Sequence, residues 1–156
     1  MIEILIKKFA GLHKSKKLEL FNSLADQMSK DDSLIYLFNE GDILIEDRSN
    51  INYVNIDKKD ISFHKSDGAV LTTNYLSENY AEYLEKYKFV KMDRYSFVNI
   101  DNIEWYDLSY FSVMFYNKSK LFVAGSWLRK HASAIGANKN IKYSRDYNKL
   151  EFKPIL

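Results

Sequence analysis

The chain has 156 residues, with 23 Lys and Arg against 21 Asp and Glu, and it contains no Cys. This length fits one domain with a modest extension. The lack of Cys excludes disulfides, thiolate nucleophiles and Cys-based zinc sites, and makes the cytoplasm the expected location. The net charge of +2 indicates no strongly charged partner unless the basic residues gather on one face.

Two apolar stripes at helical spacing open the chain. The first is too short and too charged to span a bilayer, so no membrane contact is expected. The spacing predicts two short helices, over 2–12 and 16–29, within an extension that covers residues 1–32. Part of each stripe is expected to dock on the main domain, and any uncovered remainder predicts a homodimer through these helices. The stripes consist of Ile2, Leu5, Ile6, Phe9 and Leu12, and of Leu18, Phe21, Ala25 and Met28.

Apolar alternation from Ser33 onward predicts a series of strands. Asp67-Gly68 is typical of a two-residue hairpin turn, and residues 58–60 form another polar turn. The many Tyr and Phe residues favour the same half-buried strands. The predicted elements in this half are a strand–turn–strand unit over 33–49, strands at 51–56, 61–66 and 69–73, and a helix over 74–87.

The second half alternates again and then ends in a helix and a tail. Ser126 is a candidate N-cap, and Gly136 a candidate terminating residue, for a helix over 127–135. The basic tail, residues 137–156, predicts either two short strands or a strand and a coil. The strands expected before that helix are 89–92, 95–100, 103–107, 110–117 and 121–125. This order of elements indicates an α+β fold with antiparallel sheets.

Catalytic and metal-binding patterns are missing from the sequence. The three histidines, His13, His64 and His131, are scattered and show no HExxH spacing. The chain has no Walker lysine loop and no GxGxxG, and with five Gly in total a phosphate-cradling loop is not expected. We therefore expect a protein that is not an enzyme and that needs no metal or cofactor.

The stretch FVKMDRYSFVNIDNI, residues 89–103, resembles the central motif of the LytTR DNA-binding domain of bacterial response regulators. Other landmarks agree with it: INYV at 51–54, the turn at Asp67-Gly68, and KLFVAGSWLRK at 120–130. The resemblance covers residues 33–136. The residues before it are too few to form a phospho-receiver, so the resemblance is to a member without that domain.

The resemblance implies small antiparallel sheets with short helices, and sequence-specific binding of double-stranded DNA by a bacterial transcription regulator. Arg94 would read guanine in the major groove; the alternative is a surface Arg paired with Asp93 or a nearby Glu. The other implied contacts could equally be a solvated turn, a plain surface charge or a helix cap. The implied DNA-binding residues are Lys58, Lys59, Lys91, Arg94, Ser126, Arg129 and Lys130.

Two positions depart from the family pattern. Asp93 stands where the family often has His, and its charge would repel phosphate. Ala124-Gly125 replaces a Ser-Arg step, so a frequent basic contact is lost. The chain is therefore either a DNA-binding regulator or an interaction module that regulates a partner protein. Asn99 is interpreted as structural, because such an Asn commonly bonds the local backbone. The tail either extends the DNA footprint or is a solvated edge.

Overall fold

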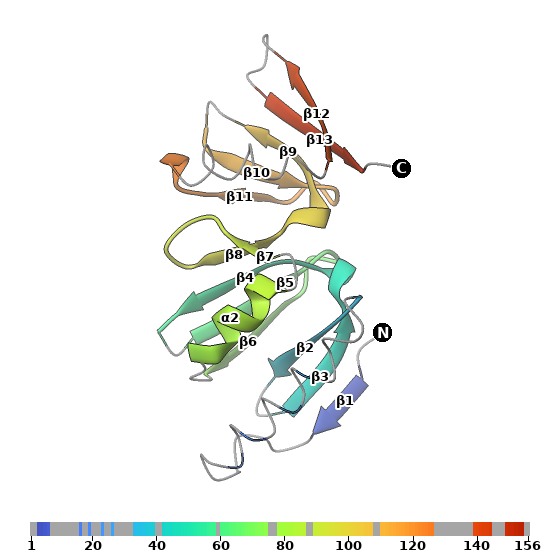
Figure 1. The fold of residues 1–156 in the computed structure, drawn as a ribbon, viewed down its shortest axis with the longest axis vertical. Coiled ribbons are helices and arrows are strands. Elements are labelled where there is room, and N and C mark those ends of the chain that lie inside the picture. The colour runs from blue at the N-terminus through green and yellow to red at the C-terminus, as the bar shows by residue number, and fades with distance from the viewer. Residues whose placement is uncertain are drawn as a thin grey trace.

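The computed structural model describes residues 3–6, 33–39, 42–58, 60–74, 78–86, 89–107, 110–126, 139–144 and 149–154, together with Lys16, Glu19, Ser23 and Asp26. This part of the chain forms three antiparallel sheets, which follow one another along the longest axis of the molecule (Figure 1). We call them the first, central and third sheets, in the order in which the chain begins them.

Each sheet combines strands that are close in sequence with strands that are not. The first sheet has the order β1 (Glu3–Ile6), β3 (Asp42–Asp47), β2 (Leu34–Asn39). The central sheet has the order β6 (Val70–Asn74), β5 (Asp60–Lys65), β4 (Ile51–Asp57), β8 (Ser96–Asn99), β7 (Phe89–Lys91). The third has the order β11 (Lys120–Phe122), β10 (Ser112–Phe115), β9 (Ile103–Asp107), β13 (Lys149–Pro154), β12 (Lys139–Ser144). One α-helix, α2 (Glu78–Lys86), and two 3-10 turns, η2 (Arg48–Asn50) and η3 (Ile100–Asn102), lie between these strands.

The central sheet is apolar on both faces because successive residues of a strand point to opposite sides. Val54 and Phe97 lie in one buried cluster, whereas their chain neighbours Tyr53 and Val98 belong to the other. The first cluster joins the central sheet to the first sheet and α2, and the second joins it to the third sheet. The alternation that predicted these strands therefore also places the sheet between two cores.

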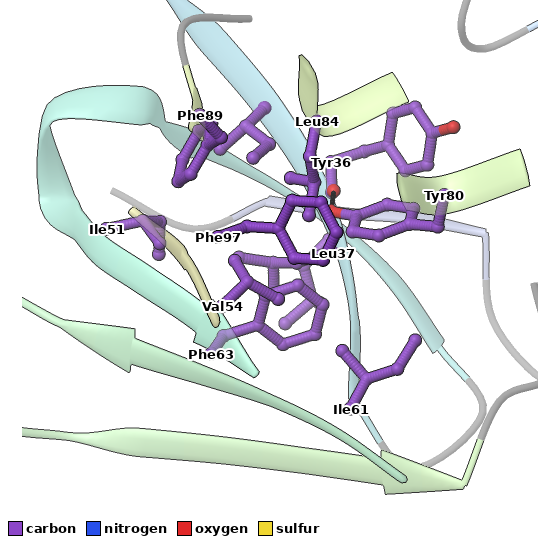
Figure 2. Close-up of a cluster of buried hydrophobic side chains, with 12 residues drawn as sticks. Tyr36, Leu37, Ile51, Val54, Ile61, Phe63, Tyr80, Leu84, Phe89 and Phe97 are labelled. Atoms are coloured by element: carbon purple, nitrogen blue, oxygen red, sulfur yellow. Dashed lines mark hydrogen bonds between the residues drawn. The ribbon is translucent and has the colours of Figure 1, made fainter. Parts of the chain in front are cut away.

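Helix α2 closes the first core with two buried side chains, Tyr80 and Leu84 (Figure 2). The Tyr80 ring meets Phe63 edge-on at 5.9 Å between ring centroids, and meets Tyr36 in the same manner at 5.7 Å. Its hydroxyl donates a hydrogen bond to the carbonyl oxygen of Tyr36. A buried tyrosine thus keeps its polar end satisfied while its ring fills the core.

The predicted fold class is confirmed in its main part. The chain folds into antiparallel sheets with few short helices, and the strand–turn–strand unit over 33–49 appears as β2 and β3. The helix expected over 74–87 is α2, and the tail contributes two strands, of which β13 pairs with β9. In the described part of the chain no helix is long and apolar enough to cross a membrane.

The N-terminal helical extension is not supported, and its first helix is wrong at Glu3–Ile6. These residues form β1, which pairs with β3 through Glu3↔Ile45 and Ile4↔Leu44. A short apolar run rich in β-branched Ile suits a strand as well as a helix, and the free edge of β3 decides between them. The helical stripe on which the dimer expectation rested is therefore absent at these residues. Of the second predicted helix only Lys16, Glu19, Ser23 and Asp26 are described, and they are helical.

Candidate nucleic-acid interface

The β4–β5 turn and the β7–β8 loop lie side by side at one end of the central sheet. Strand β4 pairs with β8 through Asn55↔Ser96, and the Ile56 amide donates a 2.9 Å hydrogen bond to the carbonyl oxygen of Tyr95. The Ser96 hydroxyl also donates to Asn55 Oδ1 at 2.8 Å. The long-range strand pairing therefore brings together the two loops that carry Lys58 and Arg94.

The side chain of Asp93 stabilises the β7–β8 loop. Its Oδ1 accepts hydrogen bonds from the amides of Tyr95, at 2.8 Å, and Ser96, at 2.7 Å. The Met92 amide closes the loop by donating to the carbonyl oxygen of Ser96. This use of an Asp side chain in place of a backbone acceptor is a known turn device. The acid that departs from the family pattern thus has a structural task inside its own loop.

Arg94 stands at the tip of that loop and is exposed. Within the described residues it makes no ion pair, and its guanidinium carbon lies 5.6 Å from the ring centroid of Tyr95. The alternative in which Arg94 pairs with Asp93 or a nearby Glu is not what the structure shows. An exposed Arg beside an aromatic ring keeps all five of its N–H donors available to a partner.

Lys58 occupies the β4–β5 turn with a backbone φ of 55°, in the left-handed region that disfavours side chains. Its flanking residues Asp57 and Asp60 are directly paired and, like Lys58, exposed. This turn therefore places acidic and basic groups close together. Lys59 lies outside the described residues.

Lys91 is less available than Arg94. It is half-buried in β7, and its ammonium lies 5.8 Å from the centroid of the Phe97 ring, within the range of a cation–π contact. A half-buried lysine commonly covers apolar surface with its aliphatic stem while its ammonium stays near solvent.

The β4–β5 turn and the β7–β8 loop are the first and second tips of this edge. A third tip forms where the β9–β10 turn meets the end of β11. The Val123 amide donates a 2.8 Å hydrogen bond to the carbonyl oxygen of Phe111, whose φ is 49°. The Phe111 ring lies against Gly125, where a β-carbon would stand 2.7 Å from the nearest ring carbon. A side chain at 125 would force this ring to move, so the position from which the family Arg is missing is tightly packed.

Ser126 is exposed at this third tip, but it is not the N-cap. Gly125 and Ser126 are both helical, so the helix begins before Ser126, which lies in its first turn. The predicted boundary was late by at least one residue, because the apolar pattern that defined the helix does not extend to Gly125. Arg129 and Lys130 lie outside the described residues.

The three tips lie on the same side of the molecule in Figure 1, at the left of the view. Figure 1 looks down the shortest axis of the molecule, so the left of the view is one of its long edges. The β4–β5 turn is the lowest of the three, the β7–β8 loop lies above it, and the β9–β10 turn with the end of β11 lies highest. An elongated partner could therefore touch all three.

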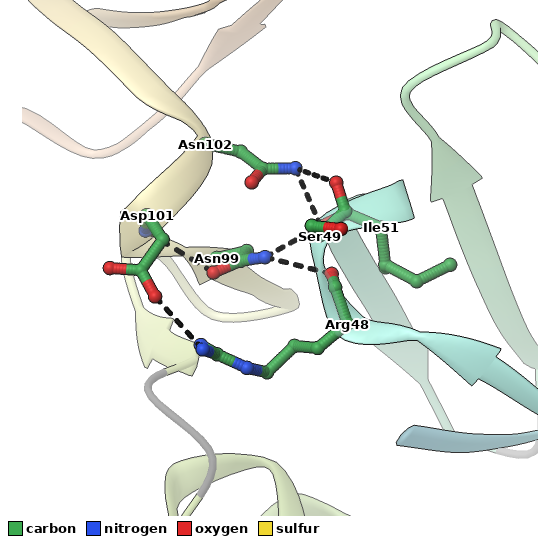
Figure 3. Close-up of polar contacts among 6 residues, drawn as sticks. All are labelled: Arg48, Ser49, Ile51, Asn99, Asp101 and Asn102. Carbon is green, nitrogen blue, oxygen red and sulfur yellow. Dashed lines mark hydrogen bonds and ion pairs between the residues drawn. The ribbon is translucent and has the colours of Figure 1, made fainter. Parts of the chain in front are cut away.

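Asn99 and Asn102 join η2 and the start of β4 to the end of β8 and η3, the turn that leads into the third sheet (Figure 3). Buried Asn99 donates to the carbonyl oxygens of Arg48 and Ile51, both at 3.0 Å, and accepts from the Asp101 amide. Asn102 donates to the carbonyl oxygen of Ser49 at 2.8 Å. The Arg48 guanidinium pairs with the Asp101 carboxylate at 3.0 Å. The structural interpretation of Asn99 is confirmed.

Three antiparallel sheets in series, with loops of the central and third sheets along one edge, define a β-rich domain. The family model of the LytTr DNA-binding domain matches residues 41–136. Since this is more than half of the 156 residues, the chain belongs to the LytTR family.

A solved structure shows the same fold. The LytTr DNA-binding domain of a protein described as a methyl-accepting/DNA response regulator from Bacillus cereus superposes with a TM-score of 0.52 and 18% sequence identity. The similarity covers 67% of this chain and 97% of that one. No curated protein matches the chain. Among the described residues, no three His, Cys, Asp or Glu gather in a way that could hold a metal ion.

Sequence reasoning missed two features of this edge. The loop-building role of Asp93 had a local signal, since Asp commonly accepts bonds from amides two and three residues on. The contact between Phe111 and Gly125 had none, because the left-handed φ of a Phe cannot be read from a sequence.

Proposed function

We propose that this protein binds double-stranded DNA in a sequence-specific manner and regulates transcription in a bacterium. Membership of the LytTR family supports the binding of DNA. The observation that carries the proposal is Arg94, which is exposed at a loop tip that Asp93 holds in shape and is free of an ion pair within the described residues. The proposed activity is binding alone, without catalysis.

Each tip has its own task in this proposal. Arg94 enters the major groove and donates two hydrogen bonds to the O6 and N7 atoms of a guanine. Lys58 contacts phosphates from the neighbouring turn, and Ser126 contacts them from the third tip. Lys59, Arg129 and Lys130 complete the proposed set of phosphate contacts. Lys91 contributes positive charge near the loop. Phosphate contacts set the position of the domain, and Arg94 supplies the sequence information.

A second function is favoured by the charges of the first tip. Asp57 and Asp60 offset Lys58 and Lys59, and Gly125 supplies no cation at the third tip. A domain with so little net positive charge on its edge would suit a partner protein better than DNA. In this alternative the chain regulates that partner and binds DNA weakly.

The test is a selection of genomic DNA fragments with the purified full-length protein, followed by affinity measurements at several salt concentrations. Enrichment of a sequence motif, with affinity that falls as salt rises, is the expected result. Arg94→Ala should then weaken binding to the motif more than to scrambled DNA, by about 1–3 kcal/mol. Lys120→Ala, which removes an exposed Lys at the start of β11, is the matched control.

No enriched motif and no salt-dependent binding would exclude the DNA proposal and leave the interaction module. Equal losses for Arg94→Ala on motif and scrambled DNA would reassign Arg94 from base reading to a phosphate contact.

A further inference from the structure

Tyr110 is the most exposed large hydrophobic residue among those the structure describes, at 71% of its surface. It lies in the β9–β10 turn, and its backbone amide donates to Asp107 Oδ1 at 3.3 Å. That bond holds the turn through the backbone and leaves the phenol side chain directed at solvent. Single exposed aromatic residues are common on protein surfaces. The position of Tyr110 in the fold therefore decides whether it has a functional role.

The place of Tyr110 is the third tip of the proposed DNA edge. Its chain neighbour Phe111 contacts Gly125, which directly precedes Ser126. Consecutive Cα atoms are about 3.8 Å apart, so Tyr110 stands within reach of the same partner surface as Ser126. The β9–β10 turn lies on the same side as the other two tips in Figure 1.

The chemistry of this tip is unlike that of the other two. A side chain at position 125 would force the Phe111 ring to move, and the one charged residue among the described residues of this tip, Asp107, is buried. Among the described residues of this tip, the exposed groups able to donate a side-chain hydrogen bond are the Tyr110 phenol and the Ser126 hydroxyl. Tyrosine hydroxyls are among the ordinary donors to DNA phosphate oxygens.

We propose that Tyr110 is a further DNA-contacting residue, whose phenol donates a hydrogen bond to a backbone phosphate at the third tip. The contact is uncharged and stands where the family pattern has a basic side chain. This inference rests on the proposed DNA binding. It adds a residue that neither the charge pattern nor the motif indicates.

An uncharged contact has a distinctive signature. Lysine and arginine release counterions when they bind phosphates, so their loss flattens the dependence of affinity on salt, whereas the loss of a tyrosine does not. Tyr110→Ala should weaken binding of the selected motif by roughly tenfold, the cost of one effective interface contact, with the salt slope unchanged. Tyr110→Phe, which retains the ring, should show most of the same loss.

Tyr116→Ala is the matched control. Tyr116 is also exposed, at 45%, but it lies in the β10–β11 hairpin at the opposite end of β10. The Tyr116→Ala substitution should leave DNA affinity unchanged. Thermal unfolding of all three variants confirms that each is folded at the temperature of the binding assay.

The outcomes separate the two proposals. If the unsubstituted protein binds no DNA in the selection, the proposed function fails. If it binds and Tyr110→Ala binds equally well, only the role of Tyr110 is overturned. Normal binding by Tyr110→Phe together with weak binding by Tyr110→Ala would overturn the hydroxyl contact, and a flattened salt slope would overturn the uncharged mechanism.

Discussion

The ring of Phe111 packs closely against Gly125, and a β-carbon at position 125 would stand 2.7 and 2.8 Å from two of its ring carbons. Phe111 reaches this position with a φ of 49°, which bulky residues rarely adopt. The contact fixes the third tip, because it ties the β9–β10 turn to the start of the helix that follows β11. Phe111 holds a strained backbone angle, and a side chain at position 125 would force its ring to move.

Gly125→Ala is therefore expected to lower the free energy of unfolding by about 1–3 kcal/mol, the usual cost of overpacking. At an exposed helical position the same change would stabilise the protein by about 1 kcal/mol, so the sign of the effect identifies the contact. Urea unfolding measures it. Phe111→Gly removes the ring and suits the left-handed φ, and in that background the cost of Gly125→Ala should largely disappear. Additive effects of the two substitutions would show that the residues do not interact.

Asp93 offers a second test, because its structural and electrostatic effects can be separated. Asp93→Ala removes the acceptor of two amide hydrogen bonds. It should destabilise the protein by about 1–2 kcal/mol and weaken DNA binding through a disordered loop. Asp93→Asn retains an oxygen acceptor and removes the negative charge. It should preserve stability and strengthen binding to all DNA sequences. Weaker binding by Asp93→Asn would mean that the carboxylate itself contributes to recognition.

Asn99 should be essential for stability, since its buried side chain makes three hydrogen bonds to the backbone. Asn99→Ala is expected to lower the free energy of unfolding by about 2 kcal/mol or more, because buried backbone groups lose their partners. Asn99→Asp has almost the same shape, but it places a carboxylate oxygen against the carbonyl oxygens of Arg48 and Ile51. Urea unfolding at neutral pH should find it at least as destabilising as Ala. Wild-type stability for Asn99→Asp would contradict the hydrogen-bond assignment.

We expect the stability of the protein to depend on pH through His64. Its ring stacks on Tyr53 with 4.0 Å between centroids, and burial lowers its pKa below the usual 6.5. Folding therefore favours the neutral ring, and the unfolded chain binds the proton more readily. The stability that His64 contributes is complete above pH 6.5 and is lost as the pH falls through its lower folded-state pKa. Urea unfolding between pH 7.5 and about pH 5 measures the decline.

His64→Phe keeps a stacking ring but cannot titrate, so this decline should disappear. A second decline should persist at lower pH, where Glu46 protonates. Burial raises the pKa of Glu46, but hydrogen bonds from Asn50 and Lys65 and the attraction of Lys65 outweigh it, so its pKa lies below 4.5. Its contribution is complete above that value and is lost as the pH falls through the folded-state pKa. If the stability of His64→Phe still falls between pH 7.5 and about pH 5, that decline belongs to another titrating group.

Much of the chain could be predicted from local pattern. The alternation around Val54 and around Phe97 predicted strands, because a strand buried on both sides selects apolar residues by a period of two. The turn chemistry of Asn99 followed from its side chain, which bonds amides two residues away. The motif at 89–103 indicated the LytTR family and placed Arg94 in a loop, whereas the break between two alternating runs placed Lys58 in a turn, and both are found there.

Tertiary structure decided what depends on residues far apart in the sequence. Glu3–Ile6 became a strand because β3 offered an edge, whereas its apolar residues suited a helix equally well. Pairing of β4 with β8 put the loops of Lys58 and Arg94 together. The excluded side chain at Gly125 arises from a ring fourteen positions earlier, held by an unusual backbone angle. Local sequence sets the preferences of a segment, and the partner that it meets in space selects among them.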